Sequence, residues 1–292
     1  MSAEFLQYLF AGVTVGATYA LVGVGFSIIY NASQVINFAQ GEFVMLGGMM
    51  TWFLFEQAGM PVAAAIPLAI LGTVAVGIAL EKFAIEPARN ASIVTLIIIT
   101  IGASIFLRGG AQLLWGRNFH VVPALSGNES IDIAGAAVAP QRLWILGVTV
   151  LVVLALNWFF SRTMTGRAMR AVAFNLLAAQ LVGVNNRRIL MLAFALAAAL
   201  GATAGALIAP MSLAYPEVGI MLGLKGFCAA ILGGLGFPYG AIAGGLIVGI
   251  SENMTAGYIS SAYKDAVAFV IILLTLFFMP NGLFGKRGAD RV

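Results

Sequence analysis

The stretch "FLQYLFAGVTVGATYALVGVGFSIIY", residues Phe5–Tyr30, decides the fold class because it contains no charged side chain. About 20 apolar residues in a helix, at a rise of about 1.5 Å per residue, cross the roughly 30 Å hydrocarbon core of a bilayer. The stretch therefore predicts a membrane-spanning helix. It follows no basic segment and precedes no small-residue cleavage site, so we expect it to remain in the mature protein.

The rest of the chain has the same apolar character. Of its 292 residues 61% are hydrophobic and 9% are charged, and the mean hydropathy is +1.02. A water-soluble protein of this size needs a more polar surface. Eight further apolar segments follow: Phe43–Phe55, Pro61–Leu80, Ile93–Leu107, Leu143–Phe160, Ile189–Ala209, Met221–Leu235, Ala241–Ser251 and Ala266–Met279. We predict one all-α polytopic membrane domain over residues 1–292, with about nine transmembrane or half-membrane segments (eight to ten).

The basic residues predict the orientation, because short loops rich in Lys and Arg stay in the cytoplasm. Such residues lie at Lys82 and Arg89, at five arginines (162, 167, 170, 187 and 188), and at Lys286, Arg287 and Arg291. We therefore place the loop 161–188 and the C-terminus in the cytoplasm. The charge-balanced loop 115–142 and the N-terminus are then periplasmic. These loops account for the net charge of +4 without a nucleic-acid partner.

Two parts of the sequence match each other at a constant spacing. Gly16-Ala17-Thr18 matches Gly201-Ala202-Thr203, and Tyr30, Gly41 and Gly48 match Tyr215, Gly226 and Gly233. In the predicted topology the two copies run in opposite directions, which makes an inverted repeat, an arrangement common in transporters. The alternative is that helices rich in glycine and alanine match by chance.

Polar residues interrupt the profile at "NASQVINFAQGEFVMLGG", residues Asn31–Gly48, and they include Asn37, Gln40 and Glu42. A carboxylate inside the membrane is costly, so Glu42 would face protein or water and line a pathway. Alternatively, residues 31–42 form a cytoplasmic loop and Glu42 favours the N-terminus of the next helix. Lys225 occupies the comparable place in the second copy. We take these four residues as pathway candidates, whereas Glu252, Lys264 and Asp265 are expected at helix ends.

The sequence contains no pattern typical of an enzyme. It has no P-loop and no paired metal ligands, and its single cysteine, Cys228, and single histidine, His120, exclude a disulfide and a Cys/His metal cluster. We expect a non-catalytic protein that binds no metal and no cofactor.

The basic loop contains a short amphipathic helix. Asn175 is suited to cap its N-terminus, and Gly183 to end it. Apolar residues at Leu176, Leu177, Leu181 and Val182 form a stripe. A helix of about two turns is not stable alone in water. It must therefore dock either on its own bundle, as a linker, or on a partner.

Four ordered stretches resemble the permease subunits of branched-chain amino acid ABC importers, with the LivH type as the nearer match. They are "GATYALVGVGFSIIYNASQVINFAQGEF", "TGRAMRAVAFNLLAAQLVGVN", "GLKGFCAAILGGLG" and "YKDAVAFVIILLTLFFMPNGLFG". The resemblance extends from about Phe5 to Gly285. It implies a permease in the bacterial inner membrane that forms part of the path for branched-chain or other hydrophobic amino acids.

The resemblance also implies partners: a second homologous permease, two ATPase subunits that use the ATP, and a periplasmic binding protein that delivers the substrate. The cytoplasmic loop then couples to the ATPases, with Gly166, Arg167, Ala171, Ala179 and Gly183 on matching positions. Phe174-Asn175 departs from the pattern, because relatives usually carry an acid there. With the local sequence, the coupling residues become Gly166, Arg167, Arg170, Asn175, Leu177, Ala179, Leu181 and Gly183.

Two alternative functions remain at this point. One is a related permease for urea or short amides, since members of the family differ in substrate. The other is an ion-coupled secondary transporter or channel. That class needs carboxylates deep inside helices, for which Glu42 is the one plausible candidate.

Overall fold

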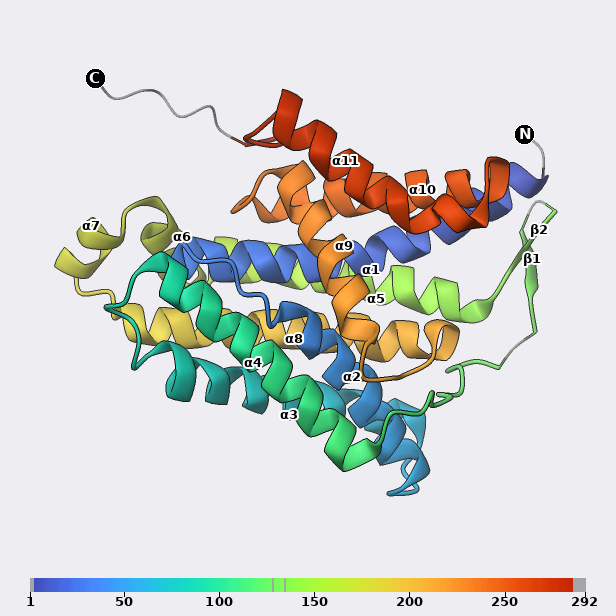
Figure 1. The fold of residues 1–292 in the computed structure, drawn as a ribbon, viewed down its shortest axis with the longest axis horizontal. Helices are drawn as coiled ribbons and strands as arrows, with labels where there is room; N and C mark the ends of the chain where they lie inside the picture. Colours follow the sequence, from blue (N-terminus) through green and yellow to red (C-terminus); the bar gives the residue numbers. More distant parts are fainter. Residues whose placement is uncertain (1–2, 128, 134, 286–292) are drawn as a thin grey trace.

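The computed structural model describes residues 3–127, 129–133 and 135–285. Most of them are helical (Figure 1). The helices are α1 (Ala3–Ser33), α2 (Gln40–Glu56), α3 (Val62–Leu80), α4 (Ile93–Trp115), α5 (Pro140–Arg162), α6 (Met164–Phe174), α7 (Leu176–Leu181), α8 (Asn186–Ser212), α9 (Val218–Gly233), α10 (Pro238–Tyr258) and α11 (Lys264–Phe278). A π-helical turn (Glu81–Ile85) extends α3, and a 3₁₀ turn (Ser261–Tyr263) precedes α11. Two strands, β1 (Ile131–Ile133) and β2 (Ala136–Val138), form an antiparallel hairpin.

Each of the nine predicted membrane segments corresponds to a helix, which confirms the all-α polytopic class. Within the described residues, six helices or helix extensions are long and apolar enough to cross a bilayer, and α9 and α10 form a further pair bent by 118°. Helices α2 and α9 have 17 and 16 residues, whereas α11 has 15 but reaches 18 with the 3₁₀ turn that precedes it. Figure 1 shows α2 and α9 lying obliquely across the long helices.

Helices α1, α5 and α8 lie close to the long axis of the molecule, whereas α4 runs at an angle to it (Figure 1). At one end of that axis lie α6 and α7, and at the other lies the β1–β2 hairpin (Figure 1). We call these the α6–α7 end and the hairpin end. The helix α1 runs from the hairpin end to the α6–α7 end, and α8 runs the opposite way. The predicted loops 161–188 and 115–142 are thus on opposite sides, whereas residues 286–291 lie outside the described residues.

The helix packing has the symmetry that the inverted repeat predicts. Helices α1–α4 correspond to α8–α11, and the main contacts between the two sets have counterparts: α1 packs on α10 as α8 packs on α3, and α2 packs on α8 as α9 packs on α1. The two short helices α2 and α9 cross each other at Gly41, Gly219 and Gly223. A methyl group added to Gly223 would lie 2.8 Å from the Cα atom of Gly41. The backbones can approach this closely only because these residues lack side chains.

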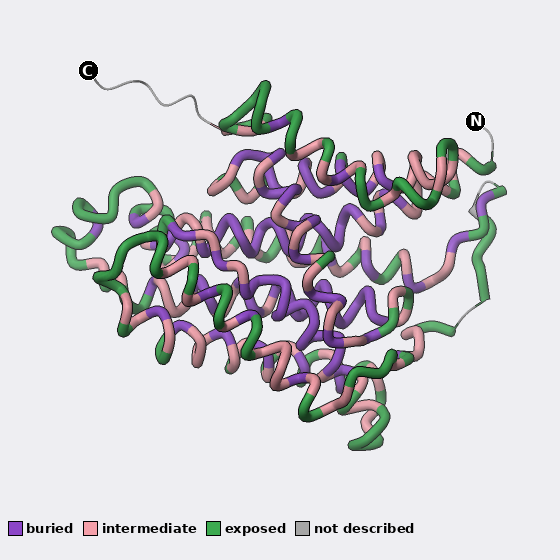
Figure 2. The backbone as a smooth tube through the Cα atoms, in the orientation of Figure 1, coloured by how far each residue is buried: buried purple, intermediate pink, exposed green. Residues whose placement is uncertain are grey.

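Burial separates an inner from an outer layer (Figure 2). The central parts of α1, α2, α8 and α9 are buried, whereas α4, α5 and α11 leave most residues at least partly exposed. The exposed residues of these outer helices are largely apolar, as lipid contact requires.

Three boundaries differ from the sequence prediction. Helix α4 continues past Leu107 to Trp115, because Arg108 has a protein partner and need not leave the membrane. Helix α10 continues to Tyr258, so Glu252 lies inside it and not at its end. Within the loop 161–188 a second helix, α6, forms where only a connection was expected, capped by the hydroxyl of Thr163.

Candidate functional site

The segment between α1 and α2 turns back into the bundle. Gln34 adopts a positive φ of 57°. The Asn37 Oδ1 atom accepts a hydrogen bond from the Ala39 N–H at 3.1 Å, and the Phe38 N–H donates to the Thr100 hydroxyl on α4 at 3.2 Å. Asn37 and Gln40 are both buried. The interpretation of residues 31–42 as a solvated cytoplasmic loop is therefore wrong for the part that leads into α2.

Gln40 joins the start of α2 to the other half of the molecule. Its Nε2 donates to the carbonyl oxygen of Ala197 on α8 at 3.0 Å. The Gln40 side chain is fully buried, so this bond takes the place of the hydrogen bond that its amide nitrogen would make with water. It also fixes the start of α2 against α8.

Glu42 lies in the first turn of α2 and is 1% exposed. Its Oε1 accepts from the Arg108 Nη2 at 2.6 Å and from the Ser104 hydroxyl at 2.8 Å, both on α4. Glu42 thus faces protein, as the first interpretation expects, and it also lies at the N-terminus of a helix, as the alternative expects; a place in the pathway stays a prediction. Two atoms of the pair have no hydrogen-bond partner among the described residues: Glu42 Oε2 and Arg108 Nε.

A cavity of ≈ 180 Å³ adjoins this ion pair, where α2 crosses α9 and α4 passes beside them. We call it the α2–α9 cavity. Its lining comprises Phe26, Phe38, Gly41, Glu42, Ile101, Ser104, Arg108, Gly219, Ile220, Gly223, Leu224 and Phe227. The cavity thus combines one carboxylate and one guanidinium with apolar walls.

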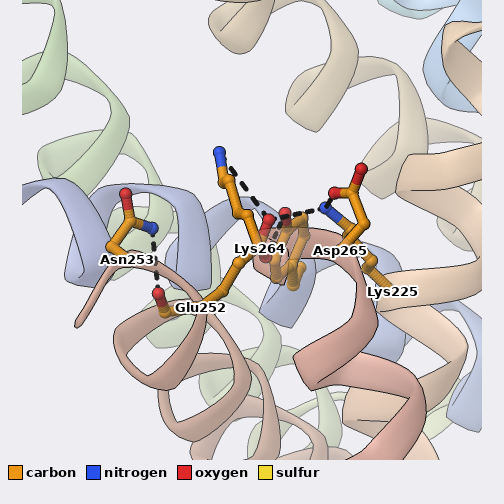
Figure 3. A network of polar contacts seen from close by, with 7 residues as sticks. Lys225, Glu252, Asn253, Lys264 and Asp265 are labelled. Atoms are coloured by element: carbon orange, nitrogen blue, oxygen red, sulfur yellow. Dashed lines mark hydrogen bonds and ion pairs between the residues drawn. The ribbon is translucent and has the colours of Figure 1, made fainter. Parts of the chain in front are cut away.

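Lys225 takes part in a separate cluster of charges (Figure 3). Its Nζ contacts Glu252 Oε1 and Asp265 Oδ1, each at 2.6 Å, while the Tyr19 hydroxyl donates to Glu252 Oε2 at 2.8 Å. Lys264 lies 3.7 Å from Glu252. The cluster connects α1, α9, α10 and α11, and two bases balance two acids. Lys225 does not line the α2–α9 cavity, so the four pathway candidates do not gather at one place.

At the α6–α7 end, local hydrogen bonds shape the predicted coupling loop. The Asn175 Oδ1 accepts from the Ala178 N–H at 3.0 Å and so caps α7, and Gly183 follows the helix with a φ of 89°. Gly166 packs on the last turn of α5: an added methyl group would lie 2.7 Å from the Cα of Phe160. The cap and the terminating glycine are where the sequence predicted them.

One face of α6 and α7 is packed on the bundle and another is not. Met169, Val172 and Ala179 belong to a buried core cluster. In contrast, Leu177 is 72% exposed and Leu181 is 88% exposed. Phe174 and Val182 extend this exposed apolar surface, and Arg167 and Arg170 lie beside it around a hollow of ≈ 510 Å³. We call Phe174, Leu177, Leu181 and Val182 the apolar stripe.

The loop is also tied to the neighbouring turn. The Arg187 Nε forms an ion pair with Glu86 at the end of the π-helical turn. This contact holds the start of α8 beside the connection between α3 and α4, so α7 is anchored at its C-terminal side.

Sequence reasoning missed Arg108 and underrated Glu252. Arg108 stands at the end of the apolar run Ile93–Leu107, four residues after Ser104, and was left outside the membrane segment. The sequence does contain a signal for Arg108. A buried Glu42 requires a basic partner, and Arg108 is one of few basic residues that directly follow an apolar run. Glu252 was assigned to a helix end because the glycines of α10 obscured the length of that helix.

Comparison with known proteins agrees with the resemblance. Residues 8–276 match the family model described as "Branched-chain amino acid transport system / permease component". The chain is 36% identical to the high-affinity branched-chain amino acid transport system permease protein LivH of Salmonella typhimurium, over 99% of this chain and 98% of that protein. It is 34% identical to the corresponding protein BraD of Pseudomonas aeruginosa, with the same coverage of 99% and 98%.

More distant similarities extend to other permeases. The chain is 26% identical to the ribose import permease protein RbsC of Haemophilus influenzae, over 92% of this chain and 83% of that protein. A solved structure of PsaBC from Streptococcus pneumoniae in complex with Fab has a TM-score of 0.49 and 17% identity, covering 96% and 97% of the two chains. On the strength of the family match and of its similarity to LivH and BraD, this chain belongs to the family of permease components of branched-chain amino acid transport systems.

Proposed function

We propose that this chain is a membrane-spanning subunit of an ATP-driven importer and forms part of the path for branched-chain or other hydrophobic amino acids. The observation that carries the proposal is the apolar stripe on α6 and α7. Exposed apolar residues on a short helix, flanked by arginines and held outside the bundle, are suited to bind a partner subunit. Membership of the family supports the substrate class.

In this proposal the chain binds no cofactor and no metal, and catalysis is left to its partners. Two ATPase subunits hydrolyse ATP and dock on the α6–α7 end, a second homologous permease completes the path, and a periplasmic binding protein delivers the amino acid to the hairpin end. The surrounding lipid covers the apolar outer helices. Movement of the two halves of the repeat relative to each other would open the path to each side in turn.

Transport by the reconstituted importer tests the proposal. The chain, expressed together with the proposed second permease, ATPases and binding protein, is placed in liposomes with labelled L-leucine outside. We expect accumulation that requires ATP inside and the binding protein outside. Accumulation driven by an ion gradient without ATP, or uptake of labelled urea or acetamide in place of leucine, would contradict the proposal.

The orientation is a second part of the proposal, in which the α6–α7 end is cytoplasmic and the hairpin end is periplasmic. In a Cys228→Ser background, single substitutions Ser126→Cys and Gln180→Cys place thiols at exposed positions near the two ends. An impermeant maleimide should label position 126 in intact cells and position 180 only after permeabilisation. The reverse pattern would overturn the orientation. Cys228 is buried, so the parent protein serves as the unlabelled control.

A further inference from the structure

The α2–α9 cavity lies at the crossing of the two short helices, which is also the contact between the two halves of the repeat. Three glycines, Gly41, Gly219 and Gly223, bring the two backbones together at its wall, because a Cβ on any of them would collide with the facing helix. With ≈ 180 Å³, it can hold several waters or one small solute. Sites for small molecules commonly occupy such places between helices.

The ion pair in this cavity is only half satisfied. Glu42 uses Oε1 for both of its bonds, to Arg108 and to Ser104, and Arg108 uses Nη2. Glu42 Oε2 and Arg108 Nε are buried and have no partner in the part of the chain that the structure describes. Most buried polar groups in proteins are paired, and leaving them unpaired is unfavourable. The ion pair beside the cavity therefore keeps one unused acceptor and one unused donor, which a ligand reaches when the two side chains turn toward the cavity.

The remaining walls are apolar. Phe227 lies 5.5 Å from Phe26 and 6.0 Å from Phe38 between ring centroids, and Ile101, Ile220 and Leu224 complete the lining. Such walls favour an aliphatic group and offer no polar partner to the hydroxyl groups of a sugar.

We propose that the α2–α9 cavity binds an apolar α-amino acid as a zwitterion. Its ammonium group donates to Glu42 Oε2, its carboxylate accepts from Arg108 Nε, and its aliphatic side chain packs against the three phenylalanines. Ser104 is a positioning residue that holds the carboxylate of Glu42 toward Arg108. This inference rests on the proposed function, because it assigns a site to the proposed substrate.

Charge balance makes a zwitterion suitable for a site inside a membrane. The ion pair is neutral and so is the ligand, so binding brings no net charge into the low-dielectric interior. Compounds that keep one charged group of leucine and lack the other would leave either Glu42 or Arg108 partly unpaired and add net charge. The site therefore predicts discrimination by charge pattern as well as by side chain.

Binding of labelled L-leucine to the purified permease–ATPase complex, without the binding protein, tests the inference. Leucinamide lacks the carboxylate and 4-methylpentanoate lacks the ammonium group, and we expect neither to compete on the unmodified complex. Glu42→Gln should weaken leucine binding at least tenfold and allow 4-methylpentanoate to compete. Arg108→Gln should weaken it similarly and allow leucinamide to compete.

The double variant Glu42→Gln/Arg108→Gln separates binding from folding. It removes both charges together and should keep the thermal stability of the complex while losing leucine binding. Glu56→Gln, an exposed carboxylate on the same helix, is the matched control and should bind leucine unchanged. Three outcomes would each overturn the inference. The double variant could bind leucine with unchanged affinity, or leucinamide and 4-methylpentanoate could compete as well as unlabelled leucine does. The third outcome is that the unmodified complex binds no leucine. Uptake by the complete importer decides the proposed function independently of these results.

Discussion

Replacing Leu181 with aspartate is expected to separate the permease from its ATPases while leaving it inserted in the membrane. Leu181 is 88% exposed at the α6–α7 end, so the bundle does not depend on it. At a contact with an ATPase, however, the variant would bury a carboxylate that has no partner. Such a burial costs about 3–5 kcal/mol, which corresponds to a loss in affinity of at least about a hundredfold.

Copurification of the ATPases with the tagged permease measures this effect, together with the ATP hydrolysis that leucine and the binding protein stimulate. Leu177→Asp should act in the same way, because Leu177 belongs to the same apolar stripe. Gln180→Asp adds the same charge to a polar exposed position of α7 and serves as the control. If Leu181→Asp retains its ATPases and still transports, α7 is a linker, and the surface that transmits the force lies elsewhere.

Replacing Lys225 with methionine is expected to produce the largest loss of stability in the molecule. Glu252 is fully buried, and its Oε1 has Lys225 at 2.6 Å as its near basic partner, whereas Lys264 is 3.7 Å away. Breaking a buried ion pair on one side leaves an uncompensated charge, at a cost of about 3–5 kcal/mol. Thermal unfolding in detergent and the yield of dispersed protein should both fall clearly.

Two further variants give this prediction its control. Glu252→Gln combined with Lys225→Met removes both charges and should recover most of the lost stability, because an apolar or neutral replacement of a buried pair is often tolerated. Lys264→Met removes a basic residue at the exposed edge of the cluster and should have a small effect. Equal stability of the single and the double variant would show that Lys225 does not stabilise Glu252.

The apolar runs predicted the membrane segments because each helix that crosses a bilayer needs its own run of about 20 apolar residues. The cap at Asn175 and the end at Gly183 were also predictable, since they depend on residues a few positions apart. Pairing between residues that are distant in the sequence was not predictable. Nothing near Glu42 in the sequence indicates Arg108, and nothing near Lys225 indicates Glu252, because these partners meet only when α4 and α10 take their places in the bundle.

The helix α6 was missed for a different physical reason. Its arginines, Arg167 and Arg170, resemble those of a solvated loop, and of its larger apolar residues only Met169 and Val172 are buried. Its stability depends on packing against the bundle, where these two side chains are buried, and on the close approach of Gly166 to α5. Such tertiary contacts have no local signature in the sequence.

The balanced charges of the two clusters determine how this subunit responds to voltage. Moving one elementary charge across a membrane potential of 100 mV changes its energy by about 2.3 kcal/mol. Glu42 with Arg108 carries no net charge, and neither do Lys225 and Lys264 with Glu252 and Asp265. When the helices shift and either cluster moves as a unit, no gating charge crosses the electric field. The membrane potential of the cell then neither drives nor opposes these movements.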